Sequence, residues 1–238
     1  MCTVTFLPLS NQNFILTSNR DEDVNRAQAL PVAQYQHYDT NIFYPKDGKA
    51  NGTWIAASTT GITLCLLNGA FVKHSFGQTY RMSRGIVLLD FFKYNDVMNY
   101  SQTYNFENIE PFTMVIVDSR QDMLQLHEMR WDGNTMHVKQ MDAMLTHIWS
   151  SVTLYSAEII KQRENWFESW LQTNNDFTPE NILMFHHFGG DGDKNSDLVM
   201  NRGFVKTVSI TCIHKTNAGS EIIYEDVIQK KLHRNLVI

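Results

Sequence analysis

Cys2 is the first side chain in the sequence with the chemistry of a nucleophile, and it directly follows Met1. Removal of Met1, which a small second side chain permits, would give Cys2 both a thiol and a free α-amine. The amine can take the thiol proton and later deliver it to a leaving group, as in N-terminal nucleophile catalysis. The alternative is that Cys2 is a small apolar residue beginning a strand, because free cysteine is commonly buried and inert.

A second polar group, Asn19-Arg20-Asp21, follows the second of two predicted strands. Alternation in residues 2–7 and 14–18, with turn-forming residues between them, predicts a hairpin. Because antiparallel partners return to the same edge, Arg20 and Asp21 are expected beside the start of the first strand. There the pair would orient the terminal amine, which carries a proton near neutral pH. The alternative is a solvent-exposed charged turn, in which an ion pair contributes little.

Composition limits the class of protein. The 238-residue chain is 43% hydrophobic and 19% charged, as in ordinary globular proteins, and we expect a single domain over residues 1–238. The net charge of -5 argues against nucleic acid or an anionic membrane as the main partner. Three widely spaced cysteines indicate neither a disulfide framework nor a zinc site. Because the sequence shows no signal peptide or long apolar run, we expect a cytoplasmic protein without a membrane anchor.

The remaining pattern predicts a layered α+β fold. Strands are expected over residues 53–58, 62–67, 112–117, 123–127, 135–138, 205–213 and 221–225, with an irregular connection over 27–49. The strand at 62–67 is apolar on both faces, which favours a central position, and it ends at Asn68. Helices are predicted over 78–93 and 157–172, and a third begins at Thr178-Pro179-Glu180.

No metal site or cofactor is predicted. Residues 191–197 are similar to a calcium loop, but Ser196 and Arg202 stand where that loop requires glycine and glutamate. His186 and His187 are adjacent, so they cannot ligate one metal from a single helix face. We expect them to be surface or capping residues.

Several motifs occur together: the initial Met-Cys, residues 18–22, residues 52–58 followed by Thr60-Gly61, Asn68, and Ser83-Arg84-Gly85 at the start of a helix. This combination resembles the NRDE family, named for its Asn-Arg-Asp-Glu motif, which includes proteins of the transport-and-Golgi-organisation type. The resemblance implies an N-terminal nucleophile hydrolase fold. That fold is a four-layer αββα sandwich of two antiparallel sheets between helices.

The resemblance also implies catalytic roles. Cys2 would be the nucleophile, and Arg20 and Asp21 would hold the terminal amine and thiol. Similarity to the wider cysteine class, which includes bile-salt hydrolases and penicillin V acylases, implies that Asn68 donates its amide to an oxyanion hole. One such donor contributes about 3 kcal/mol to lowering the barrier.

Substrate contacts are implied for Asn19, Ser151 and Lys206. Ser151 stands where the family usually has asparagine, so a second oxyanion donor would be shorter or absent. Lys206 replaces an arginine, which keeps the charge but loses the bidentate geometry.

The leading hypothesis is hydrolysis of a linear amide (C-N) bond in a small molecule of unknown identity, with Cys2 attacking the carbonyl. The alternative is a non-catalytic haem-handling or trafficking-related binding protein, because family members are linked to haem handling and Golgi organisation. In that case His74, His127, His186 or Cys65 would be candidate axial ligands. A third hypothesis, a structural or interaction module, predicts no ligand dependence.

Overall fold

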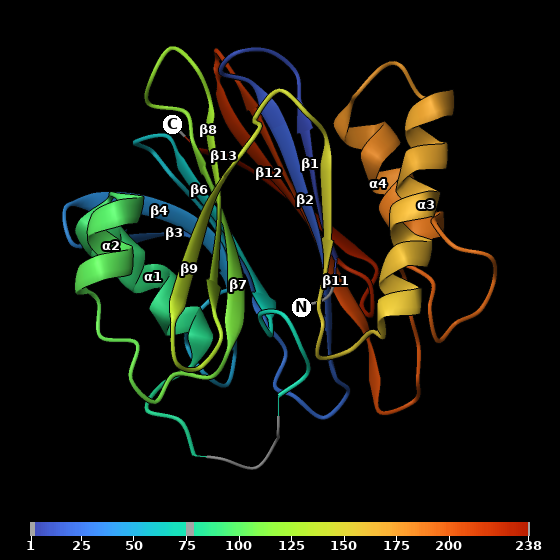
Figure 1. The fold of residues 1–238 in the computed structure, drawn as a ribbon. Helices are drawn as coiled ribbons and strands as arrows, with labels where there is room; N and C mark the ends of the chain where they lie inside the picture. The colour runs from blue at the N-terminus through green and yellow to red at the C-terminus, as the bar shows by residue number, and fades with distance from the viewer. Residues whose placement is uncertain (1–2, 75–78, 238) are drawn as a thin grey trace.

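The computed structural model describes residues 3–74 and 79–237 and arranges them in four layers (Figure 1). Two antiparallel sheets lie face to face in the middle. Helices α1 (Arg84–Tyr94) and α2 (Val97–Thr103) cover the outer face of one sheet, and α3 (Ala157–Thr173) and α4 (Pro179–Phe188) cover the other. This arrangement confirms the predicted αββα sandwich.

The first sheet contains the amino-terminal hairpin and has the strand order β10-β1-β2-β11-β12-β13. Thr3 pairs with Asn19 and Phe6 with Leu16, so β2 returns beside the start of β1 as predicted. On its other side β2 pairs with β11. The polar end of β2 therefore lies inside the sheet. The strands are β1 (Thr3–Pro8), β2 (Phe14–Asp23), β10 (His147–Ser150), β11 (Val205–Thr216), β12 (Gly219–Asp226) and β13 (Lys231–Val237).

The second sheet has the order β3-β4-β5-β6-β7-β8-β9. The strand ending at Asn68 lies between β5 and β7, which confirms its central position. The strands are β3 (Leu30–His37), β4 (Thr40–Lys46), β5 (Ile55–Ser58), β6 (Ile62–Asn68), β7 (Phe112–Asp118), β8 (Gln125–Trp131) and β9 (Met136–Met141).

The expectation of an irregular connection over 27–49 was wrong, because β3 and β4 form a hairpin there. β3 lies at the sheet edge and exposes polar side chains such as Gln34, so it lacks the apolar enrichment that marks a strand. Its turn places Tyr38 at φ 53°, a left-handed conformation usually signalled by glycine or asparagine.

Alternation along β1 and β2 divides their apolar side chains between two cores. Phe6 and Phe14 point between the sheets, whereas Leu7 and Ile15 pack with Phe167 beneath the helices α3 and α4. The site at the end of β2 is consequently enclosed on both faces of the sheet.

Helix boundaries follow local capping. Ser83 accepts a hydrogen bond from the Gly85 N–H, and Thr178 accepts one from Asn181, with Pro179 in the first turn. α1 therefore begins six residues later than the predicted start at residue 78. The short helix α2 was not predicted. Among the described helices, none has both the length and the apolar content needed to cross a membrane.

Candidate functional site

The predicted site residues Asn19, Arg20 and Asp21 lie at the carboxyl end of β2, between β1 and β11. Asn19 pairs with Thr3 on one side and with Ile210 on the other, and Asp21 pairs with Thr207. All three are buried. Cys2, the predicted nucleophile, lies outside the described residues.

Arg20 points between the two sheets. Its guanidinium stacks on the Trp54 ring, 4.3 Å from the centroid, and binds Asp47 Oδ2 at 2.6 Å and Glu22 Oε2 at 3.3 Å. Asp47 also accepts from Arg26 at 2.8 Å, so one carboxylate holds two arginines. Burial lowers the pKa of Arg20, and the Glu22 and Asp47 carboxylates oppose this shift. A fixed cation therefore lies at this end of β2.

Asp21 points to the opposite face of the sheet, toward the α3 and α4 layer. Tyr155, which precedes α3, donates its hydroxyl to Asp21 Oδ2 at 2.7 Å, and Thr207 donates to Oδ1. Only 3% of the Asp21 surface is exposed. Arg20 and Asp21 thus reach opposite faces of the same strand, as alternation requires. The idea that both hold the terminal amine and thiol stays a prediction.

Asn19 is fully buried, and its amide joins β2 to α4. Nδ2 donates to the carbonyls of His186 and Leu198, and Oδ1 bonds His186 Nδ1. The other His186 ring nitrogen bonds Thr5 Oγ1 at 2.7 Å. In this conformation Asn19 offers no exposed atom to a substrate and serves instead to pack β2 against α4.

His186 itself was expected at the surface or at a helix cap, and that expectation was wrong. Its side chain is completely buried, and burial lowers its pKa to about 3. His186 therefore stays neutral near neutral pH. The burial of His186 depends on its hydrogen bond with Asn19, which lies 167 residues away in sequence. Helical periodicity gives no information about such a distant contact.

Asn68 and Ser151 lie together. Ser151 donates its hydroxyl to the Asn68 carbonyl at 2.8 Å and also bonds Thr153. Ser151 is 1% exposed, so in this conformation its hydroxyl supports the Asn68 main chain rather than facing a ligand. Asn68 lines a polar pocket of about 150 Å³. We call it the Asn68 pocket; its lining is Arg20, Glu22, Arg26, Asp47, Gly52, Thr53, Trp54, Leu66, Asn68, Ser83, Arg84 and Gly85.

Two glycines let the start of α1 reach this pocket. A Cβ on Gly52 would lie 2.5 Å from the Gly85 carbonyl carbon, and a Cβ on Gly85 would lie 2.6 Å from the Thr53 carbonyl oxygen. The Thr53 N–H donates to the Gly85 carbonyl across this contact. The positive end of the helix dipole consequently faces the polar pocket.

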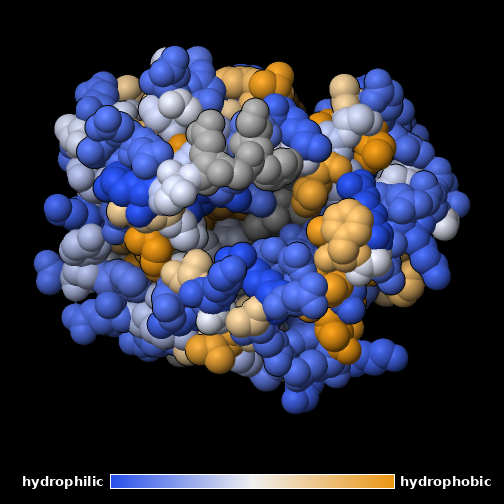
Figure 2. All heavy atoms as spheres, turned by 90° about the horizontal axis from the view of Figure 1, so that it is seen from below, coloured by the Kyte–Doolittle hydropathy of each residue, from blue (hydrophilic) through white to orange (hydrophobic). Residues whose placement is uncertain are grey.

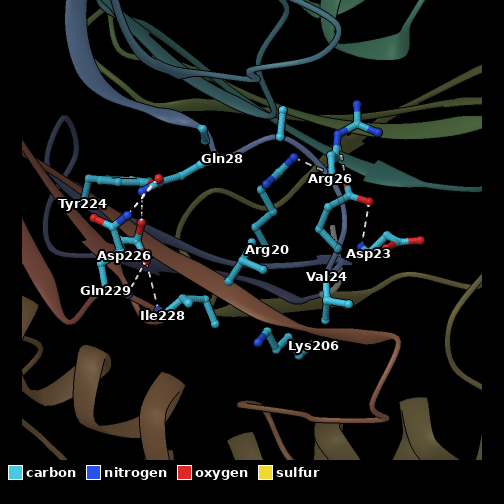
Figure 3. A pocket seen from close by; sticks show the side chains of 14 residues that line it. Arg20, Asp23, Val24, Arg26, Gln28, Lys206, Tyr224, Asp226, Ile228 and Gln229 are labelled. Carbon is cyan, nitrogen blue, oxygen red and sulfur yellow. Dashed lines mark hydrogen bonds and ion pairs between the residues drawn. The ribbon is translucent and has the colours of Figure 1, made fainter.

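Lys206 lies on a second pocket, of about 180 Å³, which shares Arg20, Glu22 and Arg26 with the first. Figure 3 shows Lys206 below Arg20, with Gln28, Asp226 and Gln229 joined by hydrogen bonds on another part of the wall. Lys206 and Asn68 thus lie on different pockets, with Arg20 lining both.

The other two cysteines are buried and free. Burial raises the pKa of Cys65 and of Cys212 to about 12. Cys65 and His186 are enclosed in the cores, so neither fits as an axial haem ligand in this fold. Within residues 3–74 and 79–237, no group of three or more His, Cys, Asp or Glu side chains could hold a metal ion.

Sequence reasoning missed Asp47, Tyr155, Thr207 and Arg163. Asp47 lies in the stretch that was expected to be an irregular connection, where it caps a turn by accepting the N–H groups of Lys49 and Ala50. Its bonds to Arg20 and Arg26 depend on the packing of the two sheets. The remaining three come from segments more than 130 residues away from β2.

The fold places the protein among the N-terminal nucleophile hydrolase-like structures. It is similar to an arginine-to-leucine variant of conjugated bile acid hydrolase from Clostridium perfringens, with a TM-score of 0.52, 10% identity, and coverage of 99% of this chain and 92% of that chain. It is also similar to the Caenorhabditis elegans ortholog of N-acylethanolamine-hydrolyzing acid amidase, with a TM-score of 0.50, 10% identity, and coverage of 89% and 92%. At this identity the likeness shows the fold alone.

A family model described as Transport and Golgi organisation 2 matches residues 1–203, and the chain belongs to this family. The match includes every residue of the polar end of β2, as well as Asn68 and Ser151. No curated protein matches the chain.

Proposed function

We propose that the protein hydrolyses a linear amide bond, with Cys2 as the nucleophile. The observation that carries the proposal is the pairing of Thr3 with Asn19 at the polar end of β2. Thr3 follows Cys2 directly, and consecutive Cα atoms are about 3.8 Å apart. This adjacency in the sequence supports Cys2 as a nucleophile that works with Arg20 and Asp21.

In the proposed reaction the Cys2 sulfur attacks the amide carbonyl while its proton moves to the α-amine. The tetrahedral oxyanion is stabilised by the Asn68 side-chain amide. The C–N bond then breaks, the α-amine gives its proton to the departing nitrogen, and an acyl thioester remains. Water, deprotonated by the same α-amine, attacks the thioester and releases a carboxylic acid.

Two hollows of different polarity support an apolar acyl group and a polar amine portion. The Asn68 pocket is rich in charged side chains, whereas a separate groove of about 440 Å³, formed by residues soon after Asn68 and Ser151 in the chain, has a largely apolar lining. Figure 2 shows a hollow in the face seen from below and hydrophobic residues gathered toward one side of it. The groove is lined by Phe71, Val72, Lys73, Val152, Thr153, Leu154, Tyr155, Ser156, Ala157 and Ile160.

The proposal is tested by intact mass and selective alkylation of the native protein from its own host. We expect a mass without Met1 and modification by iodoacetamide at Cys2 alone. Cys65 and Cys212 should not react at neutral pH, because both are buried and their pKa values are near 12. Unfolding in urea should expose all three thiols and serves as the control. Retention of Met1, or equal labelling of Cys65 and Cys212 in the folded protein, would overturn the proposed mechanism.

Replacing Asn68 with alanine should lower kcat about 100- to 1000-fold, with little change in KM, because an oxyanion donor acts in the transition state. The measurement is steady-state hydrolysis of the best substrate from a series of N-acyl amides. Asn51→Ala is the matched control, since Asn51 is exposed on the loop before β5. Equal kcat values for Asn68→Ala and Asn51→Ala would remove Asn68 from the mechanism.

A further inference from the structure

Arg163, in the middle of α3, is a completely buried cation whose hydrogen-bond partners are all neutral. Its Nη1 donates to the Thr3 hydroxyl. Nε and Nη2 donate to the Ser196 carbonyl at 3.0 and 2.8 Å, and Nη2 also donates to the Asp197 carbonyl at 2.7 Å. Across the described parts of the chain, no carboxylate forms an ion pair with it. Such burial is unfavourable without a counter-ion in contact, so the position calls for an explanation.

The same guanidinium stacks on Tyr155, with its central carbon 3.7 Å from the ring centroid. A cation over an aromatic face is attracted to the ring and draws electron density from it. This makes the Tyr155 hydroxyl a better donor to Asp21, which it binds at 2.7 Å. Arg163 therefore contacts the residue that follows Cys2 and, through Tyr155, also supports the buried carboxylate of the Asn-Arg-Asp-Glu motif.

We propose that Arg163 is a positioning residue of the hydrolytic site, which fixes the start of β1 through Thr3 and supplies a buried positive charge that favours the thiolate and the neutral amine of Cys2. This inference rests on the proposed function. A nearby cation stabilises a thiolate and destabilises an ammonium group, and attack requires that pair of forms. Arg163 would thus prepare the nucleophile without touching the substrate.

Other titratable groups near Arg163 also bear on the thiolate and amine of Cys2. Some oppose the effect of the Arg163 charge, some add to it and some are neutral. Asp21 carries the opposing negative charge, and the Tyr155 and Thr207 hydroxyls partly satisfy it. His186 is neutral because burial lowers its pKa to about 3. The titratable and charged groups that face Arg163 or Thr3 are Asp21 on β2, Tyr155 before α3, His186 on α4, Asp197 after α4 and Arg202 before β11. Arg20 lies on the opposite face of β2.

The test is the rate of Cys2 alkylation by iodoacetamide as a function of pH in the folded full-length protein. Arg163→Met should raise the midpoint of this profile by about one pH unit and slow alkylation about tenfold at neutral pH. Arg163→Lys keeps the charge and should restore most of the reactivity. Arg202→Met is the matched control. Arg202 also lies over Tyr155, at 5.1 Å, but it binds the Leu154 and Asn195 carbonyls and not Thr3.

A wild-type midpoint in Arg163→Met, or an equally raised midpoint in Arg202→Met, would overturn the role of Arg163. If Arg163→Met does not fold, Arg163→Lys is the deciding variant. A pH profile of Cys2 alkylation near that of the wild type supports the role of Arg163. A midpoint raised by about one pH unit, as expected for Arg163→Met, refutes it. Intact mass and amide turnover on the same samples report the proposed function separately. If Arg163→Met raises the midpoint but the protein hydrolyses no amide, the role of Arg163 is supported and the proposed hydrolase function is refuted. If the protein hydrolyses amides and Arg163→Met leaves the midpoint unchanged, the hydrolase function is supported and the role of Arg163 is refuted.

Discussion

Cys2→Ala should reduce amide hydrolysis by about 10⁴- to 10⁶-fold, the loss seen when one member of a catalytic unit is removed. Alanine, like cysteine, permits removal of Met1, so the variant keeps the free α-amine and loses only the thiol. The acyl-enzyme should disappear as well. Both effects are measured with the same N-acyl amide, by initial rates and by intact mass after rapid acid quenching.

Cys65→Ala provides the control for this experiment. Cys65 is a fully buried thiol between the sheets, so its loss should lower the melting temperature but leave the rate within about twofold at temperatures where the protein is folded. Blocking Met1 removal should inactivate the wild-type chain, because the base in the mechanism is the α-amine. Activity above a tenth of the wild-type rate in Cys2→Ala would exclude Cys2 as the nucleophile.

Local sequence signals account for much of the architecture. The β1–β2 hairpin, the central strand that ends at Asn68 and the cap Thr178 were all predictable, whereas the start of α1 after its cap Ser83 was predicted six residues too early. Each depends on residues close together in sequence, such as alternating apolar side chains or a cap followed by proline. Those signals also place Arg20 and Asp21 beside the start of β1.

The residues that hold the site in place from distant segments were not predictable from local sequence signals. Asp47 reaches Arg20 only because the two sheets pack face to face, and Arg163 reaches Thr3 only because α3 covers the first sheet. A buried arginine in an amphipathic helix has the same sequence pattern as an exposed one. His186 was misplaced for the same reason, since nothing in its own helix distinguishes it from the partly exposed His187.

Asp47 connects the site to both sheets. Its loop follows β4 in the second sheet, and its carboxylate binds Arg20 from β2 in the first. The position of Arg20 between the two pockets is therefore coupled to the packing of the sheets. Loss of Asp47 is expected to affect stability first and the geometry of the site as a consequence.

Asp47→Ala should lower the free energy of unfolding by about 3 to 5 kcal/mol at neutral pH, because it leaves Arg20, which is only 4% exposed, without its closest counter-ion. Urea titration followed by tryptophan fluorescence measures the change. Asp118→Ala is the matched control: Asp118 pairs with the more exposed Arg120, so its loss should cost at most about 1 kcal/mol. Similar values for the two variants would show that the Asp47 pair does not hold the sheets together.

The pH dependence of the Asp47 contribution has a defined sign. Burial alone would raise the pKa of Asp47, but the hydrogen bonds from Arg26 and the Ala50 N–H, with the charges of both arginines, bring it below its ordinary value of 3.8. A carboxyl group with a lowered pKa in the folded state stabilises the protein above its unfolded pKa, and this contribution is lost as pH falls through the folded pKa. The difference in stability between the wild type and Asp47→Asn should therefore be constant near neutral pH and should narrow in acid below the ordinary aspartate pKa. A difference that stays constant into strong acid would mean that the asparagine variant is destabilised by shape rather than by the loss of charge.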